Sequence, residues 1–357
     1  MNNALTDPVT GAAHHAGLLW NAVLDGDEYT ATGIVLAALG DGVDAETVLL
    51  DVIGAVQRRV GREWAANRIS VAQEHAATAI NERVIGGLVR ELPRPRAHRG
   101  RITVSCVDGE WHALPARLLS EVLKLRGFGV DYLGAQVPAP HLITHLHRTG
   151  PEAVALSGSL PTRLPTAHAT ISACQAAGVP VIAGGAAFGA DGRWARLLGA
   201  EAWAPDARAA ADRLTTDPLP RPRAAHQPLD DLPHLADQEY TLVTRSSPQL
   251  VRAVYAGLED RVPGMRDYTE LQRQYTAEDL AHIVEFLATA LYTDDGSLFT
   301  AFLTWTADIL AARGVPPGSL LPALDLLAGE LREFPRATAL LTEARAGLAR
   351  GTDSGGP

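Results

Sequence analysis

Residues 101–135, RITVSCVDGEWHALPARLLSEVLKLRGFGVDYLGA, decide the fold of the central part of the chain. The segment starts with a short apolar run, passes through a polar loop into the amphipathic stretch PARLLSEVLKLRG, and ends on a second run, GVDYLGA. A strand, a helix and a strand in this order predict a right-handed crossover between two parallel strands. Ligands of such sheets bind at the carboxyl ends of the strands, so we expect the chemistry in the loops that follow them.

The same alternation continues downstream of this segment. Three more strand-like runs follow, EAVALSGS, VPVIAGG and EAWAPD, and the stretches APHLITHLHRTG and LPTAHATISACQAAG have the spacing of helices. The pattern predicts a Rossmann-like, doubly wound parallel sheet over residues 99–216.

Helical patterns flank the expected sheet on both sides. Apolar residues recur at spacings of three and four from about Leu18 to Leu92, which predicts a four-helix bundle within residues 1–95. Residues 217–238 are proline-rich and aperiodic, as in a linker. Residues 239–350 carry strong amphipathic stretches such as AEDLAHIVEFLATALY and predict a separate all-α domain. The expected fold is therefore multidomain, α and α/β.

The composition excludes several classes of function. With 46% hydrophobic and 20% charged residues among 357, and a formal net charge of -10, the chain is unsuited to electrostatic binding of nucleic acid. Its two cysteines, Cys106 and Cys174, stand outside any CxxC or CxxH pattern, which argues against a disulfide framework or a zinc site. No apolar run has transmembrane length and the N-terminus does not resemble a secretory signal, so we expect a cytoplasmic protein without a membrane partner.

The loop after the first expected strand holds the most informative pair. Glu110 and His112 are two residues apart there, so the carboxylate can accept the hydrogen of one ring nitrogen and leave the other free as a metal ligand. Taken alone, an exposed His in a loop is more often ordinary polar surface than a metal ligand.

Further motifs carry a resemblance to the cobalamin-binding domain of methionine synthase and of corrinoid methyl-transfer proteins. The family has an acidic residue, any residue and His after the first strand, then Ser at the end of the third strand and Gly-Gly after the fourth. The matching residues here are Glu110, Trp111, His112, Ser157, Ser159, Gly184 and Gly185. The resemblance implies that His112 binds cobalt from below, that the serines bind the displaced benzimidazole tail, and that the glycines leave room for it. Pro115 departs from the family, which has glycine there.

The bundle carries a second resemblance, to the light-sensing repressors that bind adenosylcobalamin. Their motif IGxxWxxGxIxxAxEH is similar to VGREWAANRISVAQEH at residues 60–75. The resemblance implies that the bundle covers the upper face of the corrin, with Trp64 as an apolar wall, Glu74 accepting from ribose hydroxyls, and Val71 and His75 shaping the pocket. The alternative is a core tryptophan beside a surface Glu-His pair.

Two departures from the repressors bear on function. The repressors begin with a helix-turn-helix, which this sequence lacks, so we do not expect it to act on a promoter itself. A His follows the motif tryptophan in the repressors, whereas this chain has Ala65, which leaves His75 or water as the upper ligand after illumination. A methyl-transfer carrier would need a catalytic module of the barrel kind, and none is present in the sequence.

The C-terminal region resembles globin-like sensor domains, most clearly in LFTAFLTWTADILAARGVP at residues 298–316. A cobalamin domain joined to such a domain resembles the photocobilins, which combine adenosylcobalamin with a bilin. The resemblance implies a biliverdin held through Arg252, Tyr268 and His282, and non-covalently, because no cysteine follows Cys174. Each of these residues is also compatible with an ordinary surface or core role, and His282 with a haem ligand.

The sequence thus predicts a non-enzymatic light sensor that binds adenosylcobalamin and biliverdin. Photolysis of the Co–C bond would change the arrangement of the domains, and the output would pass to an unidentified signalling partner of a homo-oligomer. Two alternatives are a corrinoid carrier for methyl transfer and a cobalamin-responsive scaffold without pigment in its C-terminal domain.

Overall fold

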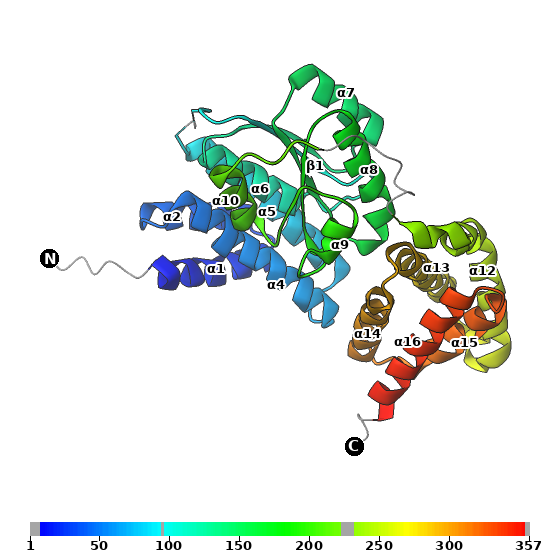
Figure 1. Ribbon diagram of the computed structural model, residues 1–357. Coiled ribbons are helices and arrows are strands. Elements are labelled where there is room, and N and C mark those ends of the chain that lie inside the picture. The colour runs from blue at the N-terminus through cyan, green and yellow to red at the C-terminus, as the bar shows by residue number, and fades with distance from the viewer. Residues whose placement is uncertain (1–7, 94–95, 223–231, 354–357) are drawn as a thin grey trace. The chain divides into compact units, whose positions relative to one another are not determined.

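The computed structural model describes residues 8–93, 96–222 and 232–353 of the chain. The chain divides into two compact units, Met1–His226 and Gln227–Pro357. The first unit combines a helical bundle with a parallel sheet, and the second is helical (Figure 1). Each unit is described by itself.

The bundle consists of four antiparallel helical segments. Its elements are α1 (Pro8–Leu24), α2 (Glu28–Gly40), α3 (Ala45–Thr47), the π-helical turn η1 (Val48–Ile53), α4 (Gly54–Ala65) and α5 (Val71–Glu91). α3, η1 and α4 form one continuous helix, since the backbone stays right-handed helical where they join. α5 begins at a capping box, in which Ser70 and Gln73 satisfy one another's backbone N–H groups.

The sheet has five parallel strands in the order β2-β1-β3-β4-β5. The strands are β1 (Arg101–Cys106), β2 (Gly129–Gly134), β3 (Ala153–Ser157), β4 (Val181–Gly184) and β5 (Ala202–Ala204). The helices of this part are α6 (Leu114–Leu125), α7 (Ala139–Thr149), η2 (Pro161–Arg163), α8 (Leu164–Ala176), η3 (Ala186–Phe188), α9 (Arg193–Leu197) and α10 (Ala207–Thr216). The chain reverses its direction of winding between β1 and β3, which places the switch point of the sheet at the ends of these two strands.

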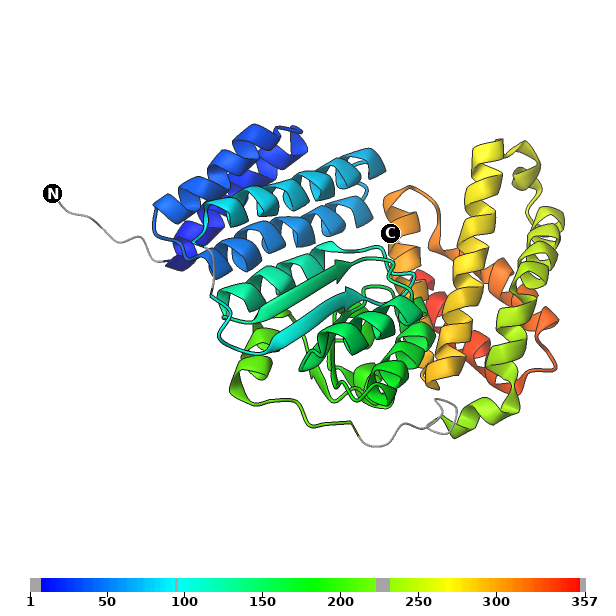
Figure 2. The same cartoon turned by 90° about the horizontal axis from the view of Figure 1, so that it is seen from above.

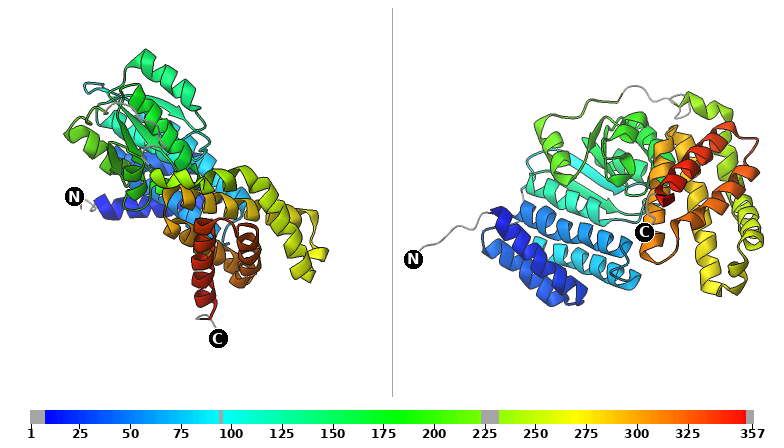
Figure 3. Two further views of the ribbon diagram at one scale, coloured as in Figure 1. Left: turned by 45° about the vertical axis from the view of Figure 1, so that its right-hand side comes forward. Right: turned by 90° about the horizontal axis from the view of Figure 1, so that it is seen from below.

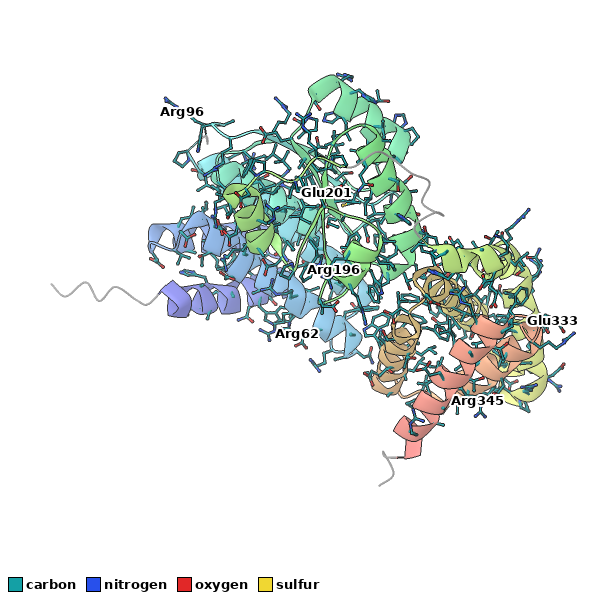
Figure 4. The ribbon with its side chains drawn as sticks, in the orientation of Figure 1. Arg62, Arg96, Arg196, Glu201, Glu333 and Arg345 are labelled. Carbon is teal, nitrogen blue, oxygen red and sulfur yellow. The ribbon has the colours of Figure 1, made fainter. Side chains whose placement is uncertain are left out.

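Helices cover both faces of the sheet. α6 and α10 pack together on the face that meets the bundle, and α7 and α8 lie together on the other face (Figures 1 and 2). Beyond the edge of the sheet, Glu201 accepts hydrogen bonds from the side chain of Gln175 and the amide of Val181, and so joins the start of β4 to β5 (Figure 4).

The bundle and the sheet share one hydrophobic core. Leu49 and Ile53 of the bundle belong to the same buried cluster as Leu118 of α6. At the rim of this joint, Glu46 accepts two hydrogen bonds from Arg126, at 2.7 and 3.0 Å, and one from Arg208 at 3.3 Å. The joint is therefore held by both apolar burial and ion pairs.

These observations confirm two predictions from the sequence, the helical bundle and the Rossmann-like parallel sheet. Across the described ranges, none of the helices combines the length and the apolar character that crossing a membrane requires.

The second unit is built from helices around a core of its own (Figure 3). Its elements are η4 (Pro233–Asp237), α12 (Glu239–Arg261), η5 (Pro263–Asp267), α13 (Glu270–Thr293), α14 (Gly296–Ala312), η6 (Pro317–Leu320), α15 (Leu321–Glu330) and α16 (Pro335–Asp353). Arg336 at the start of α16 contacts Asp237, Asp294 and the carbonyl oxygen of Leu291. Arg345, labelled on α16 in Figure 4, pairs with Asp325 of α15. The helical character agrees with the sequence, while the likeness to globins stays a prediction.

Candidate functional site

The loop that follows β1 meets the end of β3 at the switch point of the sheet. The amide of Val107 donates to the carbonyl oxygen of Ser157 at 2.9 Å, and the amide of Gly158 donates to that of Gly184 at 3.0 Å. The ends of β1, β3 and β4 are therefore tied together side by side. Gly109 takes a positive φ of 77°, which lets the chain turn back toward Glu110.

Glu110 is the centre of this arrangement. Its side chain is fully buried, yet its carboxylate accepts four backbone hydrogen bonds, two from each loop. Oε1 accepts from the amides of Trp111 and His112, both at 2.9 Å, and Oε2 accepts from those of Ser159 at 2.7 Å and Leu160 at 3.0 Å. Burial alone would raise the pKa of Glu110, but hydrogen bonds from His112 and from these amides outweigh it and lower the pKa to about 2. Glu110 is thus an ionised group that fastens the two loops to each other.

His112 is oriented by the same carboxylate. Its Nδ1 lies 2.6 Å from Oε1 of Glu110, so Nδ1 carries the hydrogen and Nε2 keeps its lone pair. The side chain is 41% exposed, and the nitrogen is therefore accessible to a ligand. This is the geometry that the sequence predicted for the pair.

The serines at the end of β3 and the glycines at the end of β4 differ in burial, in hydrogen bonding and in the space around them. The side chain of Ser157 is buried at the end of β3, whereas Ser159 is half-buried and uses its amide to bind Glu110. A Cβ at Gly185 would lie 2.2 Å from the carbonyl oxygen of Gly158, and one at Gly184 would lie 3.1 Å from that of Ala204. The backbone therefore requires glycine at 185 and leaves little room for a side chain at 184, a closer cause than the room for a cofactor that the sequence suggested.

The end of the bundle lies beside this loop. The His75 ring, in the first turn of α5, is 6.4 Å from the indole of Trp111, and that indole is 4.7 Å from the ring of His112. Val71 is 56% exposed and Trp111 54%, which is unusual for large apolar side chains. Trp64 ends α4 and packs partly against the core. The structure therefore brings the two sequence motifs to one place, about 40 residues apart in the chain.

A chain of hydrogen bonds supports the polar residues of the bundle. Nδ1 of His75 lies 2.6 Å from Oε2 of Glu74, and Oε1 of Glu74 accepts from Thr78 at 3.1 Å. Gln57 donates to Thr78 at 2.7 Å and accepts from Asn81 at 2.8 Å. The sequence analysis missed Gln57, Thr78 and Asn81. The signal for Asn81 was its place on the apolar face of α5, where a buried amide needs partners.

These residues fit a corrinoid. A corrin ring supplies four nitrogen ligands to its cobalt, so the protein need add only an axial one, and His112 offers a free imidazole nitrogen with a carboxylate behind it. Trp111 and Val71 provide exposed apolar surface for the ring, and Glu74 provides a hydrogen-bond acceptor beside it.

In the second unit, the residues expected to bind a bilin come from three different segments. Arg252 is exposed on α12 and His282 is exposed on α13, whereas Tyr268 packs partly into the core before α13. Two surface hollows of this unit are lined by other residues, one around Trp305 and Glu343 and one around Leu242 and Phe334. The geometry adds no support for a bilin site at these three positions.

Comparison with known families matches both parts of the first unit. Residues 17–88 match one family described as B12 binding domain, and residues 100–214 match a second family with the same description. The two matches cover the bundle and the sheet that meet at His112.

Several known proteins are similar to about half of this chain. The trimethylamine corrinoid protein of Methanosarcina barkeri is 22% identical over 200 residues, which cover 54% of this chain and 91% of the relative. Among solved structures, the monomethylamine corrinoid protein of Methanosarcina barkeri is 21% identical, covers 55% of this chain and 95% of its own, and has a TM-score of 0.48. A cobalamin-binding protein from Desulfitobacterium hafniense DCB-2 is 23% identical, with coverage of 58% and 97% and a TM-score of 0.32.

Proposed function

We propose, on the premise that this chain with its two B12 binding domains is a cobalamin-binding protein, that it binds the adenosyl form of the cofactor and acts as a light sensor. The observation that carries the proposal is the position of Glu74 and His75, which come from the bundle but lie beside the loop of Trp111 and His112. A hydrogen-bond acceptor and a flat apolar surface beside His112 suit a large upper ligand of the cofactor that carries hydroxyl groups.

Each residue has a distinct role in the proposal. His112 would hold the cobalt through Nε2, and Glu110 holds the imidazole in the tautomer that would allow this. Glu74, fixed through Thr78, would accept hydrogen bonds from the ribose of the adenosyl group, and Trp64 would shield that group from water. When bound, adenosylcobalamin supplies a cobalt–carbon bond that green light breaks.

A light-induced change of conformation has to overcome the contacts that join the bundle to the sheet. Once Glu74 has lost its hydrogen-bonding partner, the bundle is still held by the shared core and by Glu46 with its two arginines. We therefore expect a small shift of the end of α5 rather than separation of the two parts. Such a shift would change the surface offered to a partner, and biliverdin in the second unit would add a second colour response.

A corrinoid carrier for methyl transfer is the second candidate, and two observations favour it. The curated relatives are named corrinoid proteins, and they cover 54% of this chain. In addition, the exposed side chains of Val71 and Trp111 leave apolar surface at the opening, where a methyltransferase would have to reach the cofactor. In this role the second unit would dock the methyltransferase.

Spectra of the purified full chain separate the candidates. The protein is loaded with adenosylcobalamin in the dark and its absorption is recorded before and after green light, with free adenosylcobalamin as reference. A sensor should bleach to a lit spectrum that shows a protein nitrogen ligand, and its dissociation constant for adenosylcobalamin should be below that for hydroxocobalamin. Equal constants for both forms, or a preference for methylcobalamin, would refute the sensor and favour the carrier.

Variants connect the spectra to the proposed residues. His112→Ala should lose the nitrogen ligand to cobalt, which shifts the absorption bands or prevents retention of the corrinoid. His145→Ala is a matched control, because His145 is a half-buried imidazole of the same sheet that is also paired with a carboxylate, Asp131, at 3.1 Å. Trp64→Ala should reduce the preference for the adenosyl form. Unchanged spectra for His112→Ala would refute the ligand assignment.

The bilin is tested separately. Biliverdin is added to the full chain with and without bound cobalamin, and a red absorption band that survives gel filtration would support a pigment in the second unit. Loss of that band in His282→Ala, with Arg252→Gln and Tyr268→Phe measured beside it, would identify the binding residues. Absence of any retained band would leave the cobalamin sensor without its bilin.

A further inference from the structure

A fully buried amide lies at one end of the chain of hydrogen bonds that leads to Glu74. Nδ2 of Asn81 donates to Oε1 of Gln57 at 2.8 Å, and Nε2 of Gln57 donates to the hydroxyl of Thr78 at 2.7 Å. Thr78 in turn donates to Oε1 of Glu74 at 3.1 Å. Gln57 belongs to α4 and the other three residues belong to α5, so the chain of hydrogen bonds crosses between two helices of the bundle.

The direction of these hydrogen bonds follows from the group at the outer end. A carboxylate can only accept, so the contact between Thr78 and Glu74 uses the single hydrogen of the Thr78 hydroxyl. That hydroxyl must then accept from Gln57, which turns the NH2 end of the Gln57 amide toward Thr78 and its oxygen toward the NH2 group of Asn81. If position 81 offered no donor, the Gln57 amide could turn over, and its oxygen would compete with Glu74 for the hydrogen of Thr78.

Asn81 is a costly residue for the bundle itself. It lies on the buried face of α5 with Ala77 and Val84, and its Oδ1 accepts no hydrogen bond within the described part of the chain. A buried acceptor without a partner destabilises a fold, whereas a leucine of nearly the same shape would carry no such cost. The packing of the bundle therefore does not explain the amide, but its effect on Glu74 does.

Glu74 is the group on which these hydrogen bonds act. Its Oε1 is held by Thr78, and its Oε2 lies 2.6 Å from Nδ1 of His75. Each carboxylate oxygen can accept two hydrogen bonds, so both oxygens keep an acceptor site after these contacts. The side chain is 28% exposed, and a ligand can therefore reach an acceptor whose position is already fixed.

We propose that Asn81 and Gln57 are positioning residues, which hold Glu74 as a fixed acceptor and so select an upper ligand of the cofactor that carries neighbouring hydroxyl groups. The proposal rests on the proposed function, since it assumes that Glu74 meets the ribose of the adenosyl group. Neither residue has to touch the cofactor. Their loss should change the discrimination between upper ligands and leave the retention of the corrin intact.

The test compares two cobalamins that differ in the hydroxyl groups of the upper ligand. One is adenosylcobalamin, and the other carries adenine on a five-carbon alkyl chain in place of the ribose. Dissociation constants for both are measured in the dark by absorption titration of the full chain, and their ratio gives the selectivity for the hydroxyl groups. Asn81→Leu and Gln57→Met remove the link from either helix. Thr32→Val is the matched control, because Thr32 is a half-buried polar residue of α2 that lies next to Gly87 of α5.

Asn81→Leu and Gln57→Met should each lower the selectivity by about three- to tenfold, the effect of one net hydrogen bond, and should leave the binding of the ribose-free cobalamin within about twofold of wild type. Thr32→Val should leave both dissociation constants unchanged. In a Glu74→Ala background, Asn81→Leu should lower the selectivity no further, because it acts through Glu74. Thermal unfolding of each variant reports on the fold.

Three results would overturn the proposal. They are an unchanged selectivity, equal weakening for both cobalamins, which would show that the two residues only support the bundle, and a further fall of selectivity in the Glu74→Ala background. If the wild-type chain binds neither cobalamin, or binds both equally well, the proposed function itself fails. If it prefers adenosylcobalamin and both variants keep that preference, only this inference fails.

Discussion

Replacing Glu110 by Gln tests whether one buried carboxylate fastens the two loops of the site. Gln has the same shape, but one of its two ends is an NH2 group that cannot accept a hydrogen bond. That end must face either the amides of Trp111 and His112 or those of Ser159 and Leu160, so at least two partly buried N–H donors lose their acceptor. At about 1–3 kcal/mol for each unsatisfied donor, the free energy of unfolding should fall by about 2–6 kcal/mol.

Glu121→Gln is the matched control. Glu121 is also buried in the sheet part, with a side chain that is 3% exposed, but its partners are the side chains of Arg117 and Lys124, both at 3.0 Å. These long side chains can turn to water, whereas backbone amides cannot, so the loss should stay below about 1.5 kcal/mol.

The assay is urea unfolding of the cofactor-free chain, followed by tryptophan fluorescence. Five of the six tryptophans, Trp20, Trp64, Trp111, Trp194 and Trp203, belong to the first unit, so the signal reports mainly on it. With a slope of about 2–3 kcal/mol per molar urea, Glu110→Gln should lower the midpoint by roughly 0.7–3 M. A midpoint no lower than that of Glu121→Gln would refute the reasoning, since it would mean that the four amides find other acceptors.

Three further predictions concern stability. Glu46→Gln should lower the free energy of unfolding, measured with urea near neutral pH, by about 1–2 kcal/mol. The hydrogen bond from Arg126 holds the pKa of Glu46 below its usual 4.5. The stabilisation by Glu46 is therefore complete above pH 4.5 and is lost as the pH falls through the lowered pKa. A difference in unfolding free energy between Glu46→Gln and wild type that grows in acid would contradict the assignment. Gly185→Ala should lower the free energy of unfolding by about 3 kcal/mol or more, because at a φ of 99° its Cβ would clash with the carbonyl oxygen of Gly158. Gly178→Ala, at a φ of 77° with open space around it, should lower it by only about 1 kcal/mol. Equal losses of stability in thermal scans would refute the clash. Arg336→Lys should lower the thermal midpoint of the second unit by several degrees, since Lys cannot reach all of the acceptors of Arg336, and an unchanged midpoint would show that those contacts are dispensable.

The fold of the first unit could be predicted from local patterns. The continuous helical period of the apolar residues gives way near Ile102 to short strand-like runs that alternate with helices, and Pro93 marks the break. Such signals lie within a few residues of each other in the chain, so a single sequence contains them. The fused core between the bundle and α6 could not be predicted this way, because it depends on which faces of distant helices meet.

The site could be predicted only in part. Glu110 and His112 are two residues apart, and their contact follows from that spacing. The other bonds of Glu110 reach Ser159 and Leu160, about 50 residues away, and only the pairing of β1 with β3 brings those amides near. The same holds for Gln57, whose contacts with Thr78 and Asn81 give no sign in the sequence.

The rigidity of the loops around Glu110 and His112 affects both the rate and the affinity of cofactor binding. Glu110 fastens the two loops to each other, and the end of the bundle packs on a core that it shares with the sheet, so contacts within the protein hold the residues around His112 in place. A ligand that enters a preorganised opening loses less of its affinity to the ordering of loops. The protein should therefore bind its cofactor efficiently at low concentration, and should keep a binding-competent conformation when no cofactor is bound.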